Sequence, residues 1–347
     1  MTIFNKITKA LKGSLPFTVY RHPQEDQIKG FFQKNDKIYY TDTYKESGFV
    51  FAPFDDVKSA VLFPVEESEV FTSHFQEDDL VVTPPKDSFS SVTEQEKKNH
   101  IDLIQKGIYF LKTTKNKKVV LSRKLQLERS DFELLVTFKK LLSAYKNAMV
   151  YVWFHPKVGL WMGATPETLL RVKGDKFSTM ALAGTQLYSG SLKVIWQDKE
   201  KLEQQFVTDY IVEKLKNNVT VSDVKTIKAG SLVHLCTNIS GNLSQQFSLK
   251  NLIKLLHPTP AVCGFPQQEA KVFILDNEHY SREFYTGFLG EMNIDGTSSL
   301  FVNLRCMQVL TSSIVIYVGG GITIDSHPKK EWEETVAKSN VMLKVLV

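Results

Sequence analysis

Cysteine is scarce in this sequence, and no apolar run approaches the length of a membrane span. The three cysteines, Cys236, Cys263 and Cys306, are widely spaced, so they form neither a disulfide framework nor a metal or redox motif. The N-terminal segment MTIFNKITKALKGSLPF has no long apolar core and no small-residue cleavage site, which argues against a signal peptide. We therefore expect a soluble protein of the cytoplasm, with no membrane partner.

Charge of one sign is not concentrated either. The 347 residues include 43 Lys or Arg and 38 Asp or Glu, for a net charge of +5, and the lysines are interleaved with acids. Proteins that bind nucleic acids more often gather basic residues together with exposed aromatic residues. The sequence therefore predicts no nucleic-acid partner, although a modest positive charge would help to attract an anionic substrate.

The hydrophobic pattern favours an α+β fold. Short apolar runs such as GFVFAPF and MVYVWF predict strands, and SSLFVNLRCMQVL and SSIVIYVGGG look like paired strands. Capping-box spacing of Thr93 and Glu96 predicts the start of one helix. A second helix is expected from about Asp198 to Lys216, with an inward face of Leu202, Phe206, Tyr210 and Val212 or Leu215. Antiparallel-looking strands interrupted by long helices are typical of α+β proteins.

Four segments carry a resemblance to a known family. In chain order they are KVVLSR (118–123), GATPETLLR (163–171), HPTPAVCGFP (257–266) and GGGITIDSHPKKEWEETVAK (319–338). Together they resemble the chorismate-utilising enzymes. The resemblance implies one chorismate-binding domain over residues 1–347, with two large packed β-sheets and helices on the outside. Residues 93–347 would be the catalytic core, and residues 1–90 a poorly matched N-terminal portion.

Three features resemble the isochorismate synthase branch of that family. Lys118 precedes VVLSR, where anthranilate synthases typically carry glutamine, and Ala183 stands where aminodeoxychorismate synthases place a nucleophilic lysine. HPTPAVCGFP also has the form found in isochorismate synthases. The resemblance implies an isomerase that converts chorismate to isochorismate for menaquinone or siderophore biosynthesis.

This reaction adds water at ring carbon 2 and expels the hydroxyl from carbon 4, so it needs one base and one acid. By resemblance, Lys118 is the base and Glu167 the acid. A lysine can act so only if its pKa falls from about 10.4 towards roughly 7–8. A partly buried, apolar setting would keep Glu167 protonated. Otherwise, Lys118 would be a solvated lysine and Glu167 an acid in a turn.

The family binds Mg²⁺ through two glutamates on separate helices, which match Glu203 and Glu334 here. Magnesium prefers oxygen ligands and retains several waters, so two carboxylates and the substrate suffice. Gln204 departs from the family, which often has histidine there. Alternatively, Glu203 lies on a solvated helix face and Glu334 pairs only with Lys338. Glu331 and Glu333 compete for the ligand role, although Glu333 would point away from the helix face that carries Glu331 and Glu334.

The resemblance also implies a binding site for the two carboxylates and the ring of chorismate. Arg305, expected in a strand, would grip one carboxylate, with Lys338 as a second candidate. Backbone N–H groups of Gly319, Gly320 and Gly321 could face the same anion. Ring contacts are expected from Gly184, Thr185, Ala261, Val262 and Tyr285. His234 would bond a ring substituent or be a satisfied core histidine.

Several alternatives stay open at this point. A salicylate synthase would add pyruvate elimination to the same first step, and an anthranilate-type synthase would need a glutaminase partner. A catalytically inactive relative would bind chorismate without turnover. We expect chorismate as the substrate, Mg²⁺ as the cofactor, no glutaminase subunit, and a monomer or homodimer.

Overall fold

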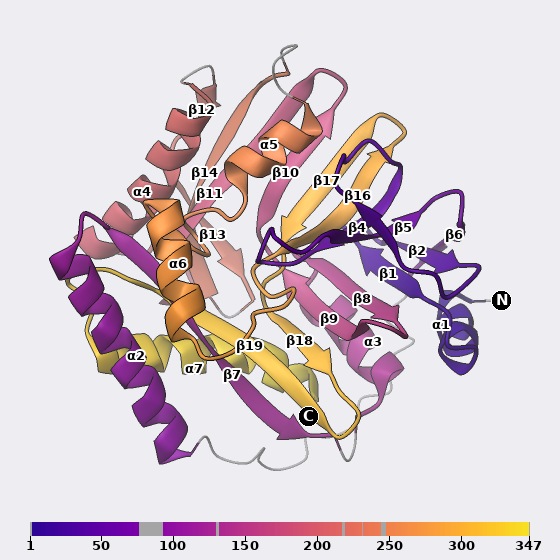
Figure 1. The fold of residues 1–347 in the computed structure, drawn as a ribbon, viewed down its shortest axis with the longest axis horizontal. Coiled ribbons are helices and arrows are strands. Elements are labelled where there is room, and N and C mark those ends of the chain that lie inside the picture. Colours follow the sequence, from indigo (N-terminus) through magenta and orange to yellow (C-terminus); the bar gives the residue numbers. More distant parts are fainter. Residues whose placement is uncertain are drawn as a thin grey trace.

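The protein is built from two large antiparallel β-sheets with helices on their outer faces (Figure 1). The computed structural model describes residues 2–75, 93–129, 132–216, 219–230, 232–243 and 248–346. The α+β fold expected from the sequence is confirmed. No helix among these residues is both long and apolar enough to cross a membrane.

The first sheet has nine described strands. Their spatial order is β15 (Gly264–Phe265), β7 (Lys118–Glu128), β19 (Ser313–Ile322), β18 (Cys306–Val309), β9 (Gly159–Thr165), β8 (Met149–His155), β1 (Phe17–Arg21), β2 (Gln27–Gln33) and β6 (Ser68–His74). The long β7–β19 pair runs in register from Val119 opposite Ile322 to Glu128 opposite Ser313. This pair carries two of the motif segments side by side.

The second sheet has ten described strands, nine of them in its main path. Their order is β12 (Thr220–Val221), β14 (Leu232–Asn242), β11 (Lys176–Leu187), β10 (Thr168–Lys173), β17 (Thr297–Val302), β16 (Phe288–Ile294), β4 (Gly48–Ala52), β5 (Ala60–Pro64) and β3 (Tyr39–Thr41), with β13 (Lys225–Ala229) paired to β14. The order as described thus places β11 and β14, which carry LAGTQ and HL, at one end of the sheet.

Helices cover the outer faces of both sheets. The first sheet packs against α1 (Ile3–Lys12), α2 (Glu94–Thr113), α3 (Leu134–Ala144) and α7 (Pro328–Leu346). The second packs against α4 (Asp198–Lys214) and α5 (Leu249–Leu256), and α6 (Gln267–Asn277) lies by β7 and β15. The capping box that opens α2 is present, with Thr93 and Glu96 bonding reciprocally.

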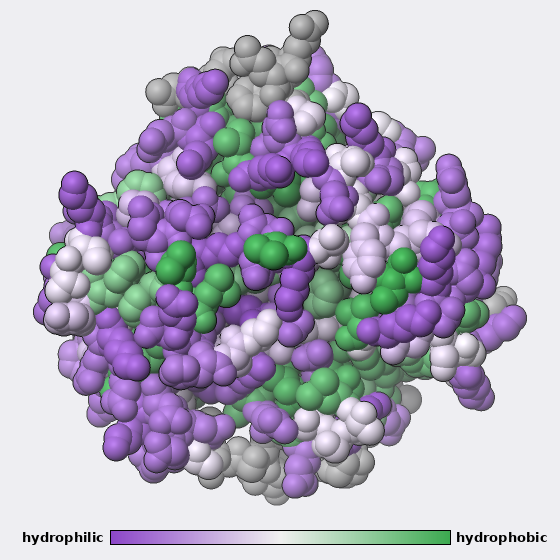
Figure 2. All heavy atoms as spheres, in the orientation of Figure 1, coloured by the Kyte–Doolittle hydropathy of each residue, from purple (hydrophilic) through white to green (hydrophobic). Residues whose placement is uncertain are grey.

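Aromatic side chains fill the space between the sheets. Phe51 of β4 stacks on Phe284 with ring centroids 4.2 Å apart, and Phe63 of β5 stacks on Trp153 of β8 at 5.1 Å. Such large rings remove much apolar surface from water, which stabilises the sandwich. Hydrophilic groups cover most of the outer face seen in Figure 2, and apolar groups appear there in smaller clusters.

The N-terminal region completes both sheets. β1, β2 and β6 extend the first sheet, and β3, β4 and β5 form one end of the second. The boundary expected between residues 90 and 93 falls at the end of segment 76–92, which lies outside the described residues. Residues 2–74 therefore share the architecture of the rest of the chain, although they carry no recognisable motif.

One strand expectation was only partly right, and the difference affects the site. The expected pairing with SSIVIYVGGG is present, because β18 pairs with β19. SSLFVNLRCMQVL forms two strands in different sheets, β17 and β18, rather than one strand. The chain crosses between the sheets at residues 303–305, where Arg305 has a positive φ of 48°. Arg305 therefore lies just before β18, in the crossing segment, and its side chain reaches the space between the sheets.

Candidate active site

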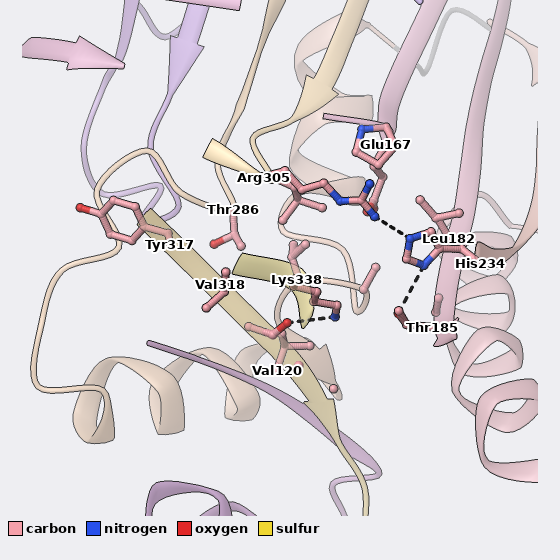
Figure 3. A pocket seen from close by; sticks show the side chains of 18 of the residues that line it. Val120, Glu167, Leu182, Thr185, His234, Thr286, Arg305, Tyr317, Val318 and Lys338 are labelled. Carbon is pink, nitrogen blue, oxygen red and sulfur yellow. Dashed lines mark hydrogen bonds between the residues drawn. The ribbon is translucent and has the colours of Figure 1, made fainter. Parts of the chain in front are cut away.

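A pocket lies between the two sheets, at the end where β7, β19, β11 and β14 approach one another. Its walls come from β7 and β19 on one side, β11 and β14 on the other, and α4, α7 and the loop after α5. Figure 3 shows Arg305, His234 and Glu167 close together on one side, and Lys338 near Val120 and Val318 on the other. Distant parts of the sequence thus converge on one cavity.

Most of the residues expected at the site line this pocket. They are Glu167, Gly184, Thr185, Glu203, His234, Ala261, Val262, Tyr285, Arg305, Gly319, Gly320, Gly321 and Lys338. The two exceptions, Lys118 and Glu334, lie directly against its glycine wall. A methyl group at Gly321 would be 2.9 Å from Lys118 Cε, and one at Gly320 would be 3.7 Å from Glu334 Oε1.

Lys118 is the first residue of β7 and is completely buried. Its Nζ lies 2.9 Å from Glu203 Oε1, yet it is not aligned for a hydrogen bond with any acceptor among the described residues. Strand alternation places Val120 in the pocket wall, while Val119 and Leu121 pack in the core beneath α2. Lys118 is thus a buried lysine with unused donor capacity at the pocket.

Glu167 occupies the short link between β9 and β10 and is 3% exposed. Its backbone carbonyl accepts a hydrogen bond from Val302 N at 2.9 Å, which fixes the link. Burial raises the pKa of Glu167 to about 8, although the charges of Lys118, Arg305 and Lys338 act in the opposite direction. The carboxyl group is therefore protonated at neutral pH and can donate a proton.

Arg305 is held by two hydrogen bonds to the protein. Nη1 donates to the carbonyl of Ala229 at 2.7 Å, and Nη2 donates to Nε2 of His234 at 2.6 Å. The other ring nitrogen of His234, Nδ1, lies 3.0 Å from the carbonyl of Gly184 and donates to it. Both nitrogens of His234 are therefore engaged, and the ring orients Arg305 towards the pocket.

Three carboxylates gather behind the glycine wall. Glu203 comes from α4, and Glu331 and Glu334 come from successive turns of α7. Each pairs with a lysine: Glu203 with Lys118, Glu334 with Lys338 at 2.7 Å, and Glu331 with Lys199. Oε2 of Glu331 is buried without a partner. A methyl group at Gly320 would contact both α7 carboxylates.

The ionisation of these carboxylates differs. Burial acts to raise the pKa of Glu203, but the charges of Lys118, Lys199 and Lys338 outweigh it and hold the pKa below its usual value. Burial raises the pKa of Glu331 despite its contact with Lys199. Glu203 is therefore a strong candidate for a charged oxygen ligand.

Glycine is required at two positions around the pocket. Gly184 has a φ of +72° at an irregularity in the β11–β14 register, a conformation that other residues rarely adopt. Gly321 has ordinary strand geometry, but any side chain there would collide with Glu203 Oε1. The Gly319–Gly321 run pairs in register with Val120–Ser122, so it is neither a bulge nor a turn.

The remaining wall is apolar and aromatic. Tyr285 stacks on Tyr317 with centroids 5.4 Å apart, and Val262 is buried beside Ala261. His257 lies outside the pocket and bonds the carbonyl of Thr286 at 3.2 Å. Thr286 and Leu304 also line the pocket, although the sequence analysis did not single them out.

The inward face of α4 differs in part from expectation. Tyr210 and Leu215 are buried as expected. Leu202 is 49% exposed, while Gln204, Val207 and Ile211 are buried. Gln204, which replaces the histidine common in the family, donates to Thr237 of β14 at 2.8 Å. This bond holds α4 against the sheet with Glu203 turned towards Lys118.

The family model described as "Chorismate binding enzyme" matches residues 52–347. The chain belongs to the chorismate binding enzyme family. The match begins at the end of β4, so it reaches further towards the N-terminus than the motifs do.

The similar proteins agree with this membership. Isochorismate synthase EntC of Escherichia coli K12 is 28% identical over 311 residues, which cover 84% of this chain and 79% of EntC. The crystal structure of a putative 2,3-dihydroxybenzoate-specific isochorismate synthase, DhbC from Bacillus anthracis, has a TM-score of 0.80 at 23% identity, covering 98% and 99% of the two chains. That of MenF from Escherichia coli, a menaquinone-specific isochorismate synthase, has a TM-score of 0.79 at 20% identity, covering 96% and 89%. The expected chorismate-binding fold is confirmed.

Proposed function

We propose that this chain is an isochorismate synthase, which isomerises chorismate to isochorismate with Mg²⁺. The observation that carries the proposal is that Lys118 and Glu167 lie at the same buried site, where the charge of Lys118 acts on Glu167. One is a fully buried lysine, and the other is a carboxylic acid that is protonated at neutral pH. The similarity to EntC, itself named an isochorismate synthase, supports the same reaction. The product would feed menaquinone or siderophore biosynthesis.

In the proposed reaction, Lys118 accepts a proton and Glu167 donates one. Lys118 takes a proton from a water molecule as the water oxygen bonds to ring carbon 2. The two ring double bonds shift, and the bond between carbon 4 and its hydroxyl oxygen breaks. Glu167 gives its proton to that oxygen, which leaves as water. One water enters and one leaves, so the net change is an isomerisation.

Lys118 must be neutral to accept the proton. Its Nζ lies 2.9 Å from Glu203 Oε1, so the proposal requires this ion pair to separate when substrate binds. Glu203 has alternative partners at hand, because Lys199 and Lys338 also lower its pKa. We infer that loading the site redistributes these ion pairs and releases Lys118.

The other charged residues would hold the substrate. Arg305 presents its guanidinium to the pocket with two of its donors already fixed by Ala229 and His234, so it is oriented before binding. Lys338 lies on the opposite wall, with Nζ 3.0 Å from the carbonyl of Gly319. Two cations on opposite walls suit a molecule with two carboxylates.

The residues behind the glycine wall fit Mg²⁺. The atoms available to bind the ion are all carboxylate oxygens, which Mg²⁺ prefers. Oε2 of Glu331 accepts no hydrogen bond from the described residues, so it is free to accept one from a water molecule bound to the ion. No three His, Cys, Asp or Glu side chains of the described residues lie close enough together to hold a metal ion by themselves, these three carboxylates included. Glu203 and Glu334 would therefore hold the ion with substrate and water, and the ion would neutralise and orient a substrate carboxylate.

Product analysis tests this function. Purified protein with chorismate and Mg²⁺ should give isochorismate as the main product by chromatography. A coupled lactate dehydrogenase assay on the same reaction measures pyruvate. Stoichiometric pyruvate would instead indicate a salicylate synthase, and binding of chorismate by calorimetry without any product would indicate an inactive relative.

A further inference from the structure

A second cavity lies at the outer edge of β7, away from the substrate pocket. Its volume is about 470 Å³, and it is bounded by α2, by residues 122–124 of β7 and by the segment that follows α6. It shares no lining residue with the substrate pocket. Cavities that bind small molecules have volumes of about 300–1,000 Å³, so its size suits a ligand larger than a single ion.

The cavity contains an arginine that the proposed reaction does not use. Arg123, the last residue of the KVVLSR motif, is 6% exposed. Its Nε donates to Thr335 Oγ1 at 2.8 Å, and its guanidinium lies over the ring of Trp332, 4.3 Å from the centroid. Nη2 is buried without an acceptor. Within the part of the chain that the structure describes, no carboxylate forms an ion pair with Arg123.

A buried histidine beside Arg123 is also unsatisfied. His100 of α2 is 4% exposed, and its Nδ1 has no hydrogen-bond partner. Burial, assisted by the charge of Arg123, lowers the pKa of His100 to about 3, so the ring is neutral and one nitrogen carries a proton. An acceptor placed between these residues could take hydrogen bonds from both.

The cavity lining carries charges of both signs, and the net charge near Arg123 depends on which of them are already paired. Lys106 and Lys124 add positive charge to the lining, and Glu96, Asp102 and Glu278 add negative charge. Glu278 is already neutralised by Arg282 at 2.5 Å and bonds Ser122. Glu96 accepts hydrogen bonds from Thr93 at the start of α2. The charge of Glu96 acts on Arg123, but no described carboxylate of the lining forms an ion pair with the guanidinium.

We propose that this cavity is a second anion-binding site, which takes the carboxylate or phosphate group of a small molecule on Arg123 and His100. A buried charge is costly unless it is paired, and an oxyanion would supply the missing pair. The planar guanidinium matches carboxylate and phosphate geometry. Thr335 and Trp332, which hold Arg123, flank Glu334 and Glu331 on α7, so the site adjoins the proposed metal ligands from behind.

The test is titration calorimetry with inorganic phosphate and with malonate, at constant ionic strength. The parent protein for the test carries Arg305→Gln, because small anions could otherwise bind in the substrate pocket. Arg123→Gln removes the central donor, and Lys106→Ala removes an exposed charge of the lining without touching the core. Lys112→Ala, also exposed on α2 but outside the cavity, is the matched control.

At least one of the two anions should bind the Arg305→Gln protein, and the tighter one identifies a phosphate or a carboxylate site. Arg123→Gln should weaken binding by about tenfold or more, the loss expected for a hydrogen bond to a charged group. Lys106→Ala should weaken binding by a smaller factor, and Lys112→Ala should leave it unchanged. If Arg123→Gln does not fold, Lys106→Glu replaces it and should also weaken binding. The proposal is overturned if neither anion binds, or if the cavity variants bind as the Lys112→Ala control does.

Discussion

Nη2 of Arg305 lies 2.6 Å from Nε2 of His234, so a neutral histidine accepts a hydrogen bond from the arginine of the pocket. The acceptor role follows from the other ring nitrogen, which donates to the carbonyl of Gly184. Burial, together with the charges of Arg305 and Lys338, holds the pKa of His234 well below its usual value. His234 therefore fixes the direction of the Arg305 guanidinium, and in the proposed function it would act on the substrate through Arg305.

We predict that His234→Ala raises KM for chorismate by about tenfold, because a hydrogen bond to a charged group contributes about 1.5–3 kcal/mol. The change in kcat should be smaller, since the residues that transfer protons remain. Steady-state kinetics measures both constants, with Asn238→Ala, an exposed position further along the same strand, as the control. An unchanged KM would show that Arg305 is oriented without His234.

A second prediction concerns Glu167 and pH. Its pKa of about 8 means that the carboxyl group is protonated below that pH and loses its proton above it. Activity that depends on this acid should therefore fall as the pH rises through about 8. Glu167→Gln should reduce kcat by roughly 10²–10⁴-fold, the usual contribution of a general acid.

The stability of the same variant provides its control. Folding raises the pKa of the Glu167 carboxyl group. At pH values above the unfolded pKa, the group would be ionised in the unfolded chain, so keeping it buried in the folded chain costs free energy and lowers stability. Glu167→Gln removes this cost. Its melting temperature at pH 8 should thus equal or exceed that of the wild type, and a lower value would mean that lost activity reflects misfolding.

Much of the architecture could be predicted from local patterns. The α2 capping box depends only on neighbours in sequence, and the structure confirms it. The interruption at residues 303–305 was missed because Asn303, Leu304 and Arg305 do not include the glycine or proline that usually signals a break. The crossing is set by which sheet each half can join, which is a long-range effect.

The site was only partly predictable for a related reason. Hydrophobic periodicity placed Leu202 inward on α4, but the inward face carries Glu203 and Gln204, whose role is polar. The ion pair between Lys199 and Glu331 joins residues far apart in sequence, and no local pattern indicates it. Family motifs supplied the remaining positions, and their assigned roles stay predictions.

The proposed metal site gives a third prediction. Activity should be lost in EDTA and restored by Mg²⁺. Glu203→Ala and Glu334→Ala should each reduce activity far more than Glu333→Ala, because Glu333 is exposed on the same helix and points away from the pocket. Activity assays with and without added metal measure this. Full activity after exhaustive chelation would remove Mg²⁺ from the mechanism.

The role of Lys118 is the centre of the account. Lys118→Gln should abolish water addition, because an amide cannot accept a proton near neutral pH. Chorismate should still bind to this variant, since Arg305 and Lys338 are unchanged. Lys117→Gln, which alters the exposed neighbouring residue, should behave as wild type.

The most direct test is chromatographic product analysis of wild type, Lys118→Gln and Lys117→Gln, each with and without saturating ammonium. The account predicts isochorismate as the main product of wild type and Lys117→Gln in both conditions, and none from Lys118→Gln. An aminated main product from wild type would contradict the proposed function. A Lys118→Gln variant that keeps most of its isochorismate yield would contradict the assignment of Lys118 as the base.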